Sequence, residues 1–446
     1  MPVAQNDIAV HHDLVERVEG ARRQSDALFG IVRPDSLYER PIPERNRIVF
    51  YIGHLEAFDW NLLHDHLPGL KSFDPELDRL FAFGIDPVNG GLPSDLPSDW
   101  PRLGSVREYV AKIRSALDEK IEENSLGSFT NGRDGFSLET LLNVAVEHRL
   151  MHVETLAYML HQLPSNRKLQ QDAPANLVTS PVTHRMLAIP SGKATLGLPR
   201  GSASFGWDNE YEAHEVFVPA FEVNQYKVTN RQYLDFVNAG GYESRSLWSD
   251  EDWKWKTDQE ISHPVFWKKE RDGWLYRGMF EEFPLPLDWP VYVSHAEAMA
   301  YARWTGKSLP TEEEWHRAAY GTTDKKTAER PYPWGSGPAD SSLGNFDFER
   351  WDPTPVNAFP RGESAFGAQD MLGNGWEWTA TKFAPFAGFE PFPFYHGYSA
   401  DFFDGQHFVM KGGSARTASC MLRSSFRNWF QPHYQYVYAG FRCVTR

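Results

Sequence analysis

The sequence predicts a fold in two parts: an N-terminal four-helix bundle, then an α+β domain of short strands and long ordered loops. Three observations carry this prediction. Apolar residues recur at helical spacing through residues 1–163. Residues 164–183, PSNRKLQQDAPANLVTSPVT, have the composition of a linker. From residue 184 to 446, short apolar runs alternate with Gly, Pro, Asn and Trp, which is typical of a loop-rich α+β domain.

Four segments of the first part are expected to be helices, at residues 8–32, 47–67, 105–121 and 137–163. Ser137 follows the breaker NGRDG and is the expected N-cap of the last helix. The connection FGIDPVNGGLPSDLPSDWPRLG is too long for a turn, and loops of this length are often functional. In the second part, only residues 294–305 and 311–320 are expected to be helical.

Composition and charge exclude several classes of protein. The chain has 446 residues and a formal net charge of −15, which disfavours nucleic acid and anionic membranes as partners. The N-terminal stretch MPVAQNDIAVHHDL lacks the features of a signal peptide, and no apolar run is long enough to span a bilayer. The two cysteines exclude a disulfide scaffold and a Cys-rich zinc site. We therefore expect a cytoplasmic protein, either a monomer or a homodimer.

A possible metal site starts from the stretch VEHRLMHVET. His148 and His152 are four residues apart, so on a helix they share one face and can bind one ion. The spelling His-Arg-Leu-Met-His lacks the glutamate of the metalloprotease helix, so a zinc protease is not supported. His54, in the aromatic second helix, is the best candidate for a third ligand from another helix.

The alternative is that such a histidine pair arises by chance, with side chains that are exposed or simply hydrogen-bonded. The other histidines of this part of the chain fit that reading: His11, His12, His64, His66 and His161. Glu154 could orient a ligand, but a solvent-facing carboxylate is the more ordinary expectation for it.

Five motifs of the second half follow one another in a fixed order: FEVNQYKVTNRQYLDFVNAGGY, LPTEEEWHRAAYG, DMLGNGWEWT, GGSAR and YAGFRCV. Together they closely resemble the formylglycine-generating-enzyme-like fold, a C-type-lectin-like domain, over residues 184–446. Preceded by a DinB-like bundle with three histidines, the whole chain resembles the EgtB family of sulfoxide synthases.

That resemblance implies an oxygenase-type enzyme in which His54, His148 and His152 bind Fe(II). Three neutral imidazoles on one face of an octahedral ion leave positions open for substrates and O2, the co-substrate. The family substrate is hercynine, the trimethylated betaine of histidine, and the new bond forms at imidazole C2. Asn428 and Trp429 match the family's substrate-contacting pair, and an aromatic pocket suits a quaternary ammonium. Trp429 could instead be core. The resemblance also implies a structural role for Asn374 and Glu377, with a bound structural calcium ion as a further expectation.

The chain departs from the commonest family pattern where the donor binds. That pattern holds γ-glutamylcysteine with an Asp after Asn-Trp, an Arg four positions later, and an Arg in the long loop. Here the first two positions are Phe430 and Tyr434, and residues 84–100 contain no Arg or Lys. Met151 replaces the usual Gln before the second helix histidine. Cysteine-using relatives have a tyrosine pair before Ile-Asp-Pro, where this chain has Phe83 and a glycine.

These departures favour the selenoneine synthase (SenA) branch, which joins hercynine to a neutral selenosugar that needs no ionic clamp. The donor is expected beside the loop around Phe83 and Asp86, the two residues expected to act in catalysis. A cysteine or γ-glutamylcysteine donor stays an alternative, because the missing charged residues argue against one kind of donor without identifying another.

The sequence raises three further alternatives. A true formylglycine-generating oxidase needs paired cysteines after GGS, but Thr417 and Leu422 stand there, and both Cys420 and Cys443 read as structural. An ovothiol-type synthase would usually add a methyltransferase after the last motif. A non-catalytic binding module is the third alternative, because this fold also serves as a ligand-binding scaffold.

Overall fold

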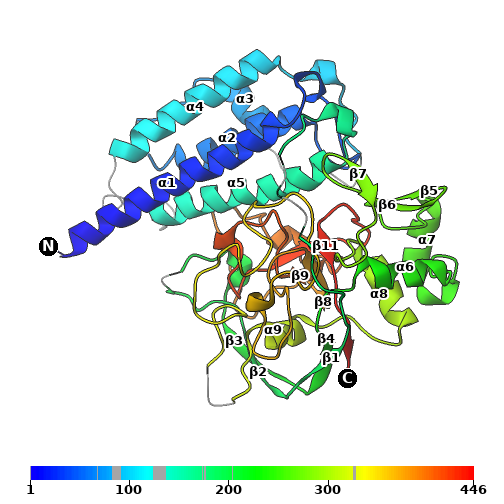
Figure 1. The fold of residues 1–446 in the computed structure, drawn as a ribbon. Helices are drawn as coiled ribbons and strands as arrows, with labels where there is room; N and C mark the ends of the chain where they lie inside the picture. Colours follow the sequence, from blue (N-terminus) through cyan, green and yellow to red (C-terminus); the bar gives the residue numbers. More distant parts are fainter. Residues whose placement is uncertain are drawn as a thin grey trace. The chain divides into compact units, whose positions relative to one another are not determined.

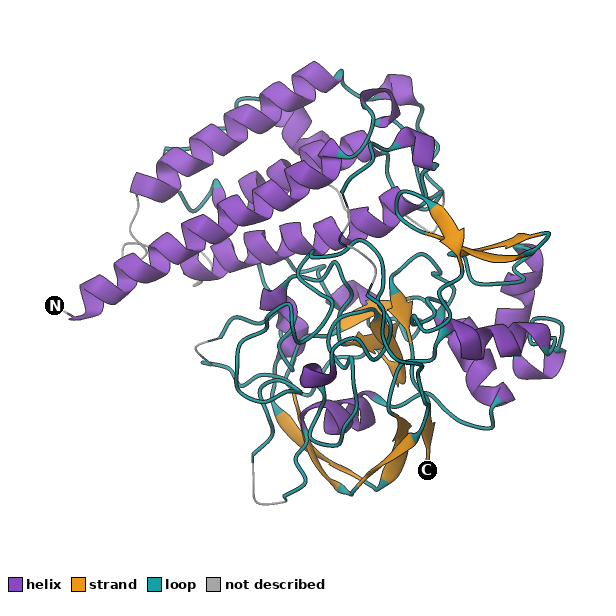
Figure 2. Cartoon of the chain, viewed as in Figure 1, coloured by secondary structure: helices purple, strands orange, loops and turns teal. Residues whose placement is uncertain are grey.

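The computed structural model describes residues 2–67, 69–82, 92–123, 137–172, 174, 177–202, 204–324 and 328–446, with side chains described from residue 12 onward. The chain forms two compact units, residues 1–171 and residues 172–446, so the division lies inside the segment 164–183. Figure 2 shows helices throughout the first unit and short strands joined by long loops in the second. The predicted fold class is confirmed.

The first unit is built from helices α1 (Pro2–Gly30), α2 (Ile48–Leu63), α3 (Pro75–Leu80), α4 (Leu103–Glu123) and α5 (Leu138–His161). Helix α1 packs along α5, and α2 packs against both α4 and α5 (Figure 1). Ser137 caps α5 as expected, because its hydroxyl accepts a hydrogen bond from the backbone N–H of Thr140 at 3.1 Å. The short helix α3 was not predicted.

The second unit contains four small sheets. Three of them are antiparallel, and in the fourth β11 runs parallel to β8. The strands are β1 (Met186–Ile189), β2 (Gly192–Leu196), β3 (His214–Val218), β4 (Phe221–Asn224), β5 (Trp267–Glu270), β6 (Gly273–Arg277), β7 (Glu282–Pro284), β8 (Trp376–Lys382), β9 (Phe408–Lys411), β10 (Asn428–Phe430), β11 (Ala439–Gly440) and β12 (Val444–Thr445). The sheet orders are β1-β4-β12, β10-β9-β8-β11, β2-β3 and β5-β6-β7.

Four helices accompany these sheets: α6 (Asn230–Asn238), α7 (Asp250–Asp258), α8 (His295–Trp304) and α9 (Glu312–Tyr320). Helices α8 and α9 lie where they were expected, while α6 and α7 are additions that the sequence analysis missed. The signal for α6 was present, since Thr229 and Gln232 form a reciprocal capping box at its start. Ser249 caps α7 through the backbone N–H of Asp252.

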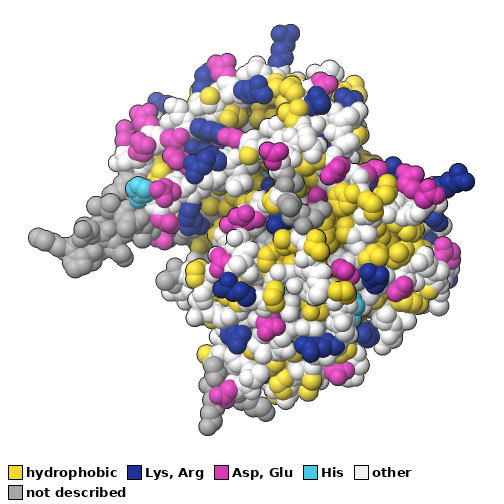
Figure 3. All heavy atoms as spheres, in the orientation of Figure 1, with side chains coloured by type: hydrophobic (Ala, Val, Ile, Leu, Met, Phe, Trp, Pro, Cys, Tyr) yellow, Lys and Arg dark blue, Asp and Glu magenta, His cyan; other side chains and the backbone are white. Residues whose placement is uncertain are grey.

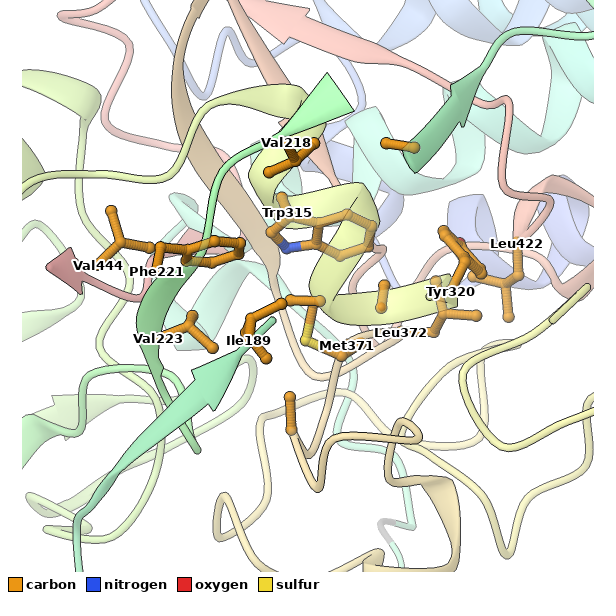
Figure 4. Packing of buried hydrophobic residues seen from close by; sticks show 14 of the residues in the cluster. Ile189, Val218, Phe221, Val223, Trp315, Tyr320, Met371, Leu372, Leu422 and Val444 are labelled. Atoms are coloured by element: carbon orange, nitrogen blue, oxygen red, sulfur yellow. The ribbon is translucent and has the colours of Figure 1, made fainter. Parts of the chain in front are cut away.

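The core of the second unit surrounds α9. Trp315 lies against side chains from two strands of the first sheet, among them Phe221 and Ile189, and against the loop residue Met371 (Figure 4). All are buried, so the helix and this sheet share one hydrophobic core. The core fixes the framework from which β8, β9 and β10 extend.

The surface carries both signs of charge. On the face shown in Figure 3, Lys and Arg side chains are interspersed with Asp and Glu. No helix among the described residues is long and apolar enough to cross a membrane.

Candidate metal centre

Three histidines from two helices converge in the first unit. His54 lies on α2, and His148 and His152 lie on α5, with one ring nitrogen of each within 4.8 Å of the others. Their ring centroids are 4.5 to 5.6 Å apart. The three residues are 3%, 3% and 2% exposed. Among the described residues, no other group of three or more His, Cys, Asp or Glu meets this closely.

A backbone carbonyl orients His54. Its Nδ1–H donates to the carbonyl oxygen of Phe81 at 2.7 Å, which leaves Nε2 as the nitrogen with a free lone pair. Gly53 allows this contact, because a Cβ atom there would lie 2.5 Å from three carbon atoms of the Phe81 ring. Within the described part of the chain, Nε2 of His54 and Nδ1 of His152 are buried without a hydrogen-bond partner. Buried polar atoms without partners are rare, so these two nitrogens point to a ligand.

Aromatic rings enclose the group. Phe58 stacks on His148 with ring centroids 3.4 Å apart, and Phe50 stacks on His54 at 4.9 Å. Burial, opposed by the Phe81 hydrogen bond and assisted by the nearby Arg149 cation, lowers the pKa of His54 to about 4. Burial also lowers the pKa values of His148 and His152 well below their usual range. All three imidazoles are therefore neutral near pH 7, the form that binds a metal.

The donor set fits a mononuclear transition-metal ion. Imidazole nitrogens suit Fe, Zn, Cu and Ni, and a site with three protein ligands keeps positions open for other molecules. The structure thus brings together the three histidines that sequence spacing singled out. It also corrects one expectation, because Glu154 is buried and does not face solvent.

The helices that carry the histidines also carry a buried network of ion pairs that the sequence analysis did not predict. Arg149 of α5 donates hydrogen bonds to Glu56 and Asp59 of α2, across more than 80 residues of sequence. All three side chains are buried. No spacing rule links these positions, so only the packing of α2 against α5 identifies the network.

Four of the residues expected to contact substrate lie in the second unit, and the fifth, Met151, lies on α5 of the first unit. Asn428, Trp429 and Phe430 form β10, antiparallel to β9, and all three are half-buried. Side chains alternate along a strand, so Asn428 and Phe430 share one face and Trp429 takes the other. Tyr434 stacks on Phe430 with centroids 5.0 Å apart and planes at 13°. The positions of the family's ionic clamp are therefore occupied by one stacked aromatic pair.

Trp429 lies in an aromatic cluster. Its ring is parallel to Phe383 at a centroid distance of 4.2 Å, and it also contacts Tyr398 and Phe402 at 5.5 and 5.6 Å. The guanidinium of Arg427 lies 5.0 Å from the Phe383 ring centroid. The half-buried indole thus adds to a group of π faces, the surface that attracts a quaternary ammonium.

The remaining expected site residues have varied placements. Met151 is half-buried on α5, directly before His152. Phe83 and Asp86 lie outside the described residues. In the described part of the same loop, Asp95 accepts a hydrogen bond from Arg47 at 2.8 Å, with Arg40 as a second partner. The Asp95 carboxylate therefore pairs with arginines from outside the loop.

The structure gives no support to calcium at Asn374 and Glu377. The Glu377 carboxylate receives hydrogen bonds from Arg442 at 2.6 and 2.8 Å, and Lys227 lies 3.2 Å away. The side chain of Asn374 bonds to Asp370 and to the backbone of Thr354. Protein cations already occupy this buried carboxylate, so it needs no metal for charge balance.

A cavity of about 290 Å³ in the second unit begins just after β10, where Gln431, Pro432 and His433 line it. His433 pairs with Asp252 at 2.9 Å and stacks on Trp255. None of the residues proposed to contact substrate lines this cavity.

The fold and the histidine group define a class of protein: a two-unit chain with a candidate metal site of three imidazoles in a helical unit, followed by a loop-rich unit. Residues 172–446 match the family model described as Sulfatase-modifying factor enzyme 1-like domain. Hercynine oxygenase from Mycolicibacterium smegmatis is 34% identical over 384 residues, covering 84% of each chain. The Mycobacterium tuberculosis hercynine oxygenase is 34% identical over 394 residues, covering 86% of this chain and 89% of the relative.

A fungal relative is more distant. Ergothioneine biosynthesis protein 1 of Neurospora crassa is 29% identical over 496 residues, covering 92% of this chain and 55% of that protein. The chain belongs to the hercynine oxygenase family, and the family predicted from its motifs is confirmed. It is accordingly an oxygenase-type enzyme.

The formylglycine-generating enzyme of Mycobacterium tuberculosis is 33% identical over 228 residues, but this match covers only 44% of this chain and 76% of that enzyme. Thr417 and Leu422 are buried where that enzyme needs its cysteines. Neither Cys420 nor Cys443 forms a disulfide, and burial raises the pKa of Cys443 to about 12. A thiol that stays protonated is a poor nucleophile.

Proposed function

We propose that this chain is an Fe(II)- and O2-dependent enzyme that joins a chalcogen donor to C2 of the hercynine imidazole. The observation that carries the proposal is the convergence of His54, His148 and His152, buried and neutral, in a chain whose relatives are named hercynine oxygenases. When bound, Fe(II) would supply open coordination positions and the redox chemistry of O2.

The overall reaction balances for a donor R–XH, where X is sulfur or selenium. The C2–H and X–H bonds break, a C2–X bond forms, and O2 is reduced by four electrons. One oxygen atom ends on X as the oxide and the other leaves as water with the two hydrogens. The chain's own residues hold three imidazoles neutral, exclude water with Phe50 and Phe58, and present aromatic faces to the substrate cation.

For the donor we propose a neutral selenosugar, as in the selenoneine synthase branch. The support is the stacked pair of Phe430 and Tyr434, which offers aromatic faces and no charge at the clamp positions. Sugars bind well to aromatic faces, whereas a dicarboxylate peptide needs cationic partners. A thiol donor is the second candidate, favoured by the similarity to the fungal ergothioneine biosynthesis protein 1.

One assay separates these donors. The full chain is loaded anaerobically with Fe(II), given hercynine and either a selenosugar, cysteine or γ-glutamylcysteine, and then exposed to O2. Mass spectrometry identifies the product and its oxidation state. We expect a C2–Se product from the selenosugar at a rate at least tenfold above that from either thiol. A sulfoxide formed equally fast from a thiol would overturn the selenium assignment, and no product from any donor would overturn the proposed function.

A further inference from the structure

The strongest polar cluster in the first unit lies beside the histidines. Nη1 and Nη2 of Arg149 donate to the two carboxylate oxygens of Glu56, each at 2.9 Å. Nη2 also donates to Asp59 at 2.6 Å and to the backbone oxygen of Leu55 at 3.1 Å. Arg149, Glu56 and Asp59 are 2%, 1% and 3% exposed. The guanidinium of Arg149 on α5 therefore hydrogen-bonds two side chains and one backbone carbonyl of α2.

The positions of these residues tie the cluster to the histidines. Arg149 directly follows His148, and Glu56 is two residues after His54. A guanidinium donating to both oxygens of one carboxylate has a fixed planar geometry, so it sets both the height and the rotation of α2 against α5. One residue of helix is 1.5 Å of rise and about 100° of rotation. A slip of one residue would therefore turn His54 away from His148 and His152.

Charge balance explains how the cluster tolerates burial. Two carboxylates face Arg149, and Arg114 of α4 supplies a second cation to Glu56 at 2.7 Å. Arg114 also pairs with Asp26 of α1 at 2.6 Å. Each buried charge therefore has an opposite charge beside it, which offsets part of the cost of its burial. Four helices of the unit are thereby linked through one network.

A buried ion pair is a poor source of stability, since apolar side chains of similar volume often stabilise a core as well or better. What a bidentate pair adds is a single allowed arrangement. Metal sites depend on such support, because residues that orient the ligands typically change metal affinity about 10- to 100-fold when they are altered. The cluster therefore differs from an apolar core in fixing one relative arrangement of the two helices, and not in adding stability.

We propose that Arg149 is a positioning residue: its bidentate pairing with Glu56, supported by Asp59, sets the register of α2 against α5 and so holds His54 opposite His148 and His152. The inference deepens the proposed function, because it rests on those three histidines binding a metal. Arg149 is not one of the three candidate ligands, and its proposed effect on their geometry runs through α2 and α5.

The test measures Co²⁺ binding to the full chain under anaerobic conditions, by titration and by the ligand-field absorption of the bound ion. R149K keeps the charge but removes the planar fork. We expect its Co²⁺ affinity to fall at least tenfold and its absorption bands to shift. The matched control is R22K, since Arg22 is also buried in this unit but pairs with Asp118 at 2.5 Å between α1 and α4. We expect R22K to bind Co²⁺ within twofold of the unaltered chain.

A triple variant separates geometry from stability. R149M/E56L/D59L replaces the ions with apolar side chains, and we expect a thermal midpoint close to that of the unaltered chain with weak Co²⁺ binding. Recovery of both stability and Co²⁺ affinity in this variant would overturn the inference, as would unaltered binding by R149K. If R149K does not fold, the triple variant decides. If the unaltered chain itself binds no Co²⁺, the metal site of the proposed function fails, and the inference fails with it.

Discussion

His54 donates its Nδ1–H to the carbonyl oxygen of Phe81 at 2.7 Å, and this contact selects the tautomer that leaves Nε2 to bind a metal. The carbonyl can reach the ring only because Gly53 has no side chain. A single hydrogen bond to a residue outside the helices therefore determines which nitrogen of His54, on α2, is left to bind a metal. It fixes the rotation of the imidazole, while the packing of α2 on α5 fixes the position of its backbone.

The substitution Gly53→Ala should weaken metal binding more than it weakens the fold. The added methyl would lie 2.5 Å from three atoms of the Phe81 ring, so the ring and its carbonyl must move. Overpacking of this kind costs about 1–3 kcal/mol, whereas Ala in a helix is otherwise favoured over Gly. Titration with Co²⁺ should show an affinity reduced about tenfold or more.

The matched control for that substitution is Gly104→Ala on α4, where an added Cβ meets no atom within 4 Å. This variant should bind Co²⁺ as the unaltered chain does and be slightly more stable. Equal metal affinity in the Gly53 and Gly104 variants would show that the Phe81 carbonyl does not orient His54.

His152→Ala should abolish both metal binding and turnover while the helices remain formed. Two imidazoles remain, which is too few for a stable mononuclear site with three protein ligands. Metal content after dialysis, product formation and the far-ultraviolet circular dichroism of the variant are the measurements. His12→Ala serves as the control, because His12 is exposed on α1 and pairs with Glu16, one turn away. A fully active His152 variant would remove the triad from the mechanism.

Metal affinity should be insensitive to pH over an unusually wide range. Protons compete for a ligand only below its pKa, and burial lowers the pKa of His54 from 6.5 to about 4 and those of His148 and His152 well below 6.5. As pH falls, protonation would release the metal, so we expect nearly constant Co²⁺ affinity from pH 7.5 to about pH 5.5 and a loss toward pH 4. Histidines with ordinary pKa values would instead lose affinity steeply below pH 6.5.

The sequence predicted the long helices, whose apolar residues repeat over many turns, and the nine-residue α9, but it missed three short helices. Helix α3 has six residues, and α6 and α7 have nine each. The capping pair of Thr229 and Gln232 could have identified α6, because that signal does not depend on length. Periodicity thus predicts long helices, and caps are the better guide to short ones.

The histidine group was predictable and its support was not. His148 and His152 share a face because of helical geometry, which is a local property. The pairing of Arg149 with Glu56 spans 93 residues and depends on how two helices dock, which spacing cannot show. The same docking explains Glu154, since nearly every residue of α5 is buried and the helix offers few solvent-facing positions. A rule that assigns carboxylates to solvent fails on such a helix.

Trp429→Ala should weaken hercynine binding and leave the rate at saturating hercynine largely intact. A cation–π contact contributes about 0.5–2 kcal/mol, so KM for hercynine should rise about 2- to 30-fold. Steady-state kinetics with hercynine and with its dimethylated analogue measure this effect, and the variant should discriminate less between the two. Trp304→Ala is the control, because that indole is on the surface of α8. An unchanged KM together with a lower thermal midpoint would make Trp429 a core residue.

The double substitution F430D/Y434R should shift the donor preference toward γ-glutamylcysteine. The two rings are stacked with centroids 5.0 Å apart, so an aspartate and an arginine at these positions would also lie side by side, in the order of the family's usual clamp. Charge-assisted hydrogen bonds to a carboxylate donor would replace an aromatic surface suited to a neutral sugar. Competition assays with equal selenosugar and γ-glutamylcysteine should show the product ratio moving at least tenfold toward the sulfur product.

The single variants F430D and Y434R should each give a smaller shift, because one charge cannot hold both ends of the donor. A ratio that does not move would mean that Phe430 and Tyr434 do not contact the donor.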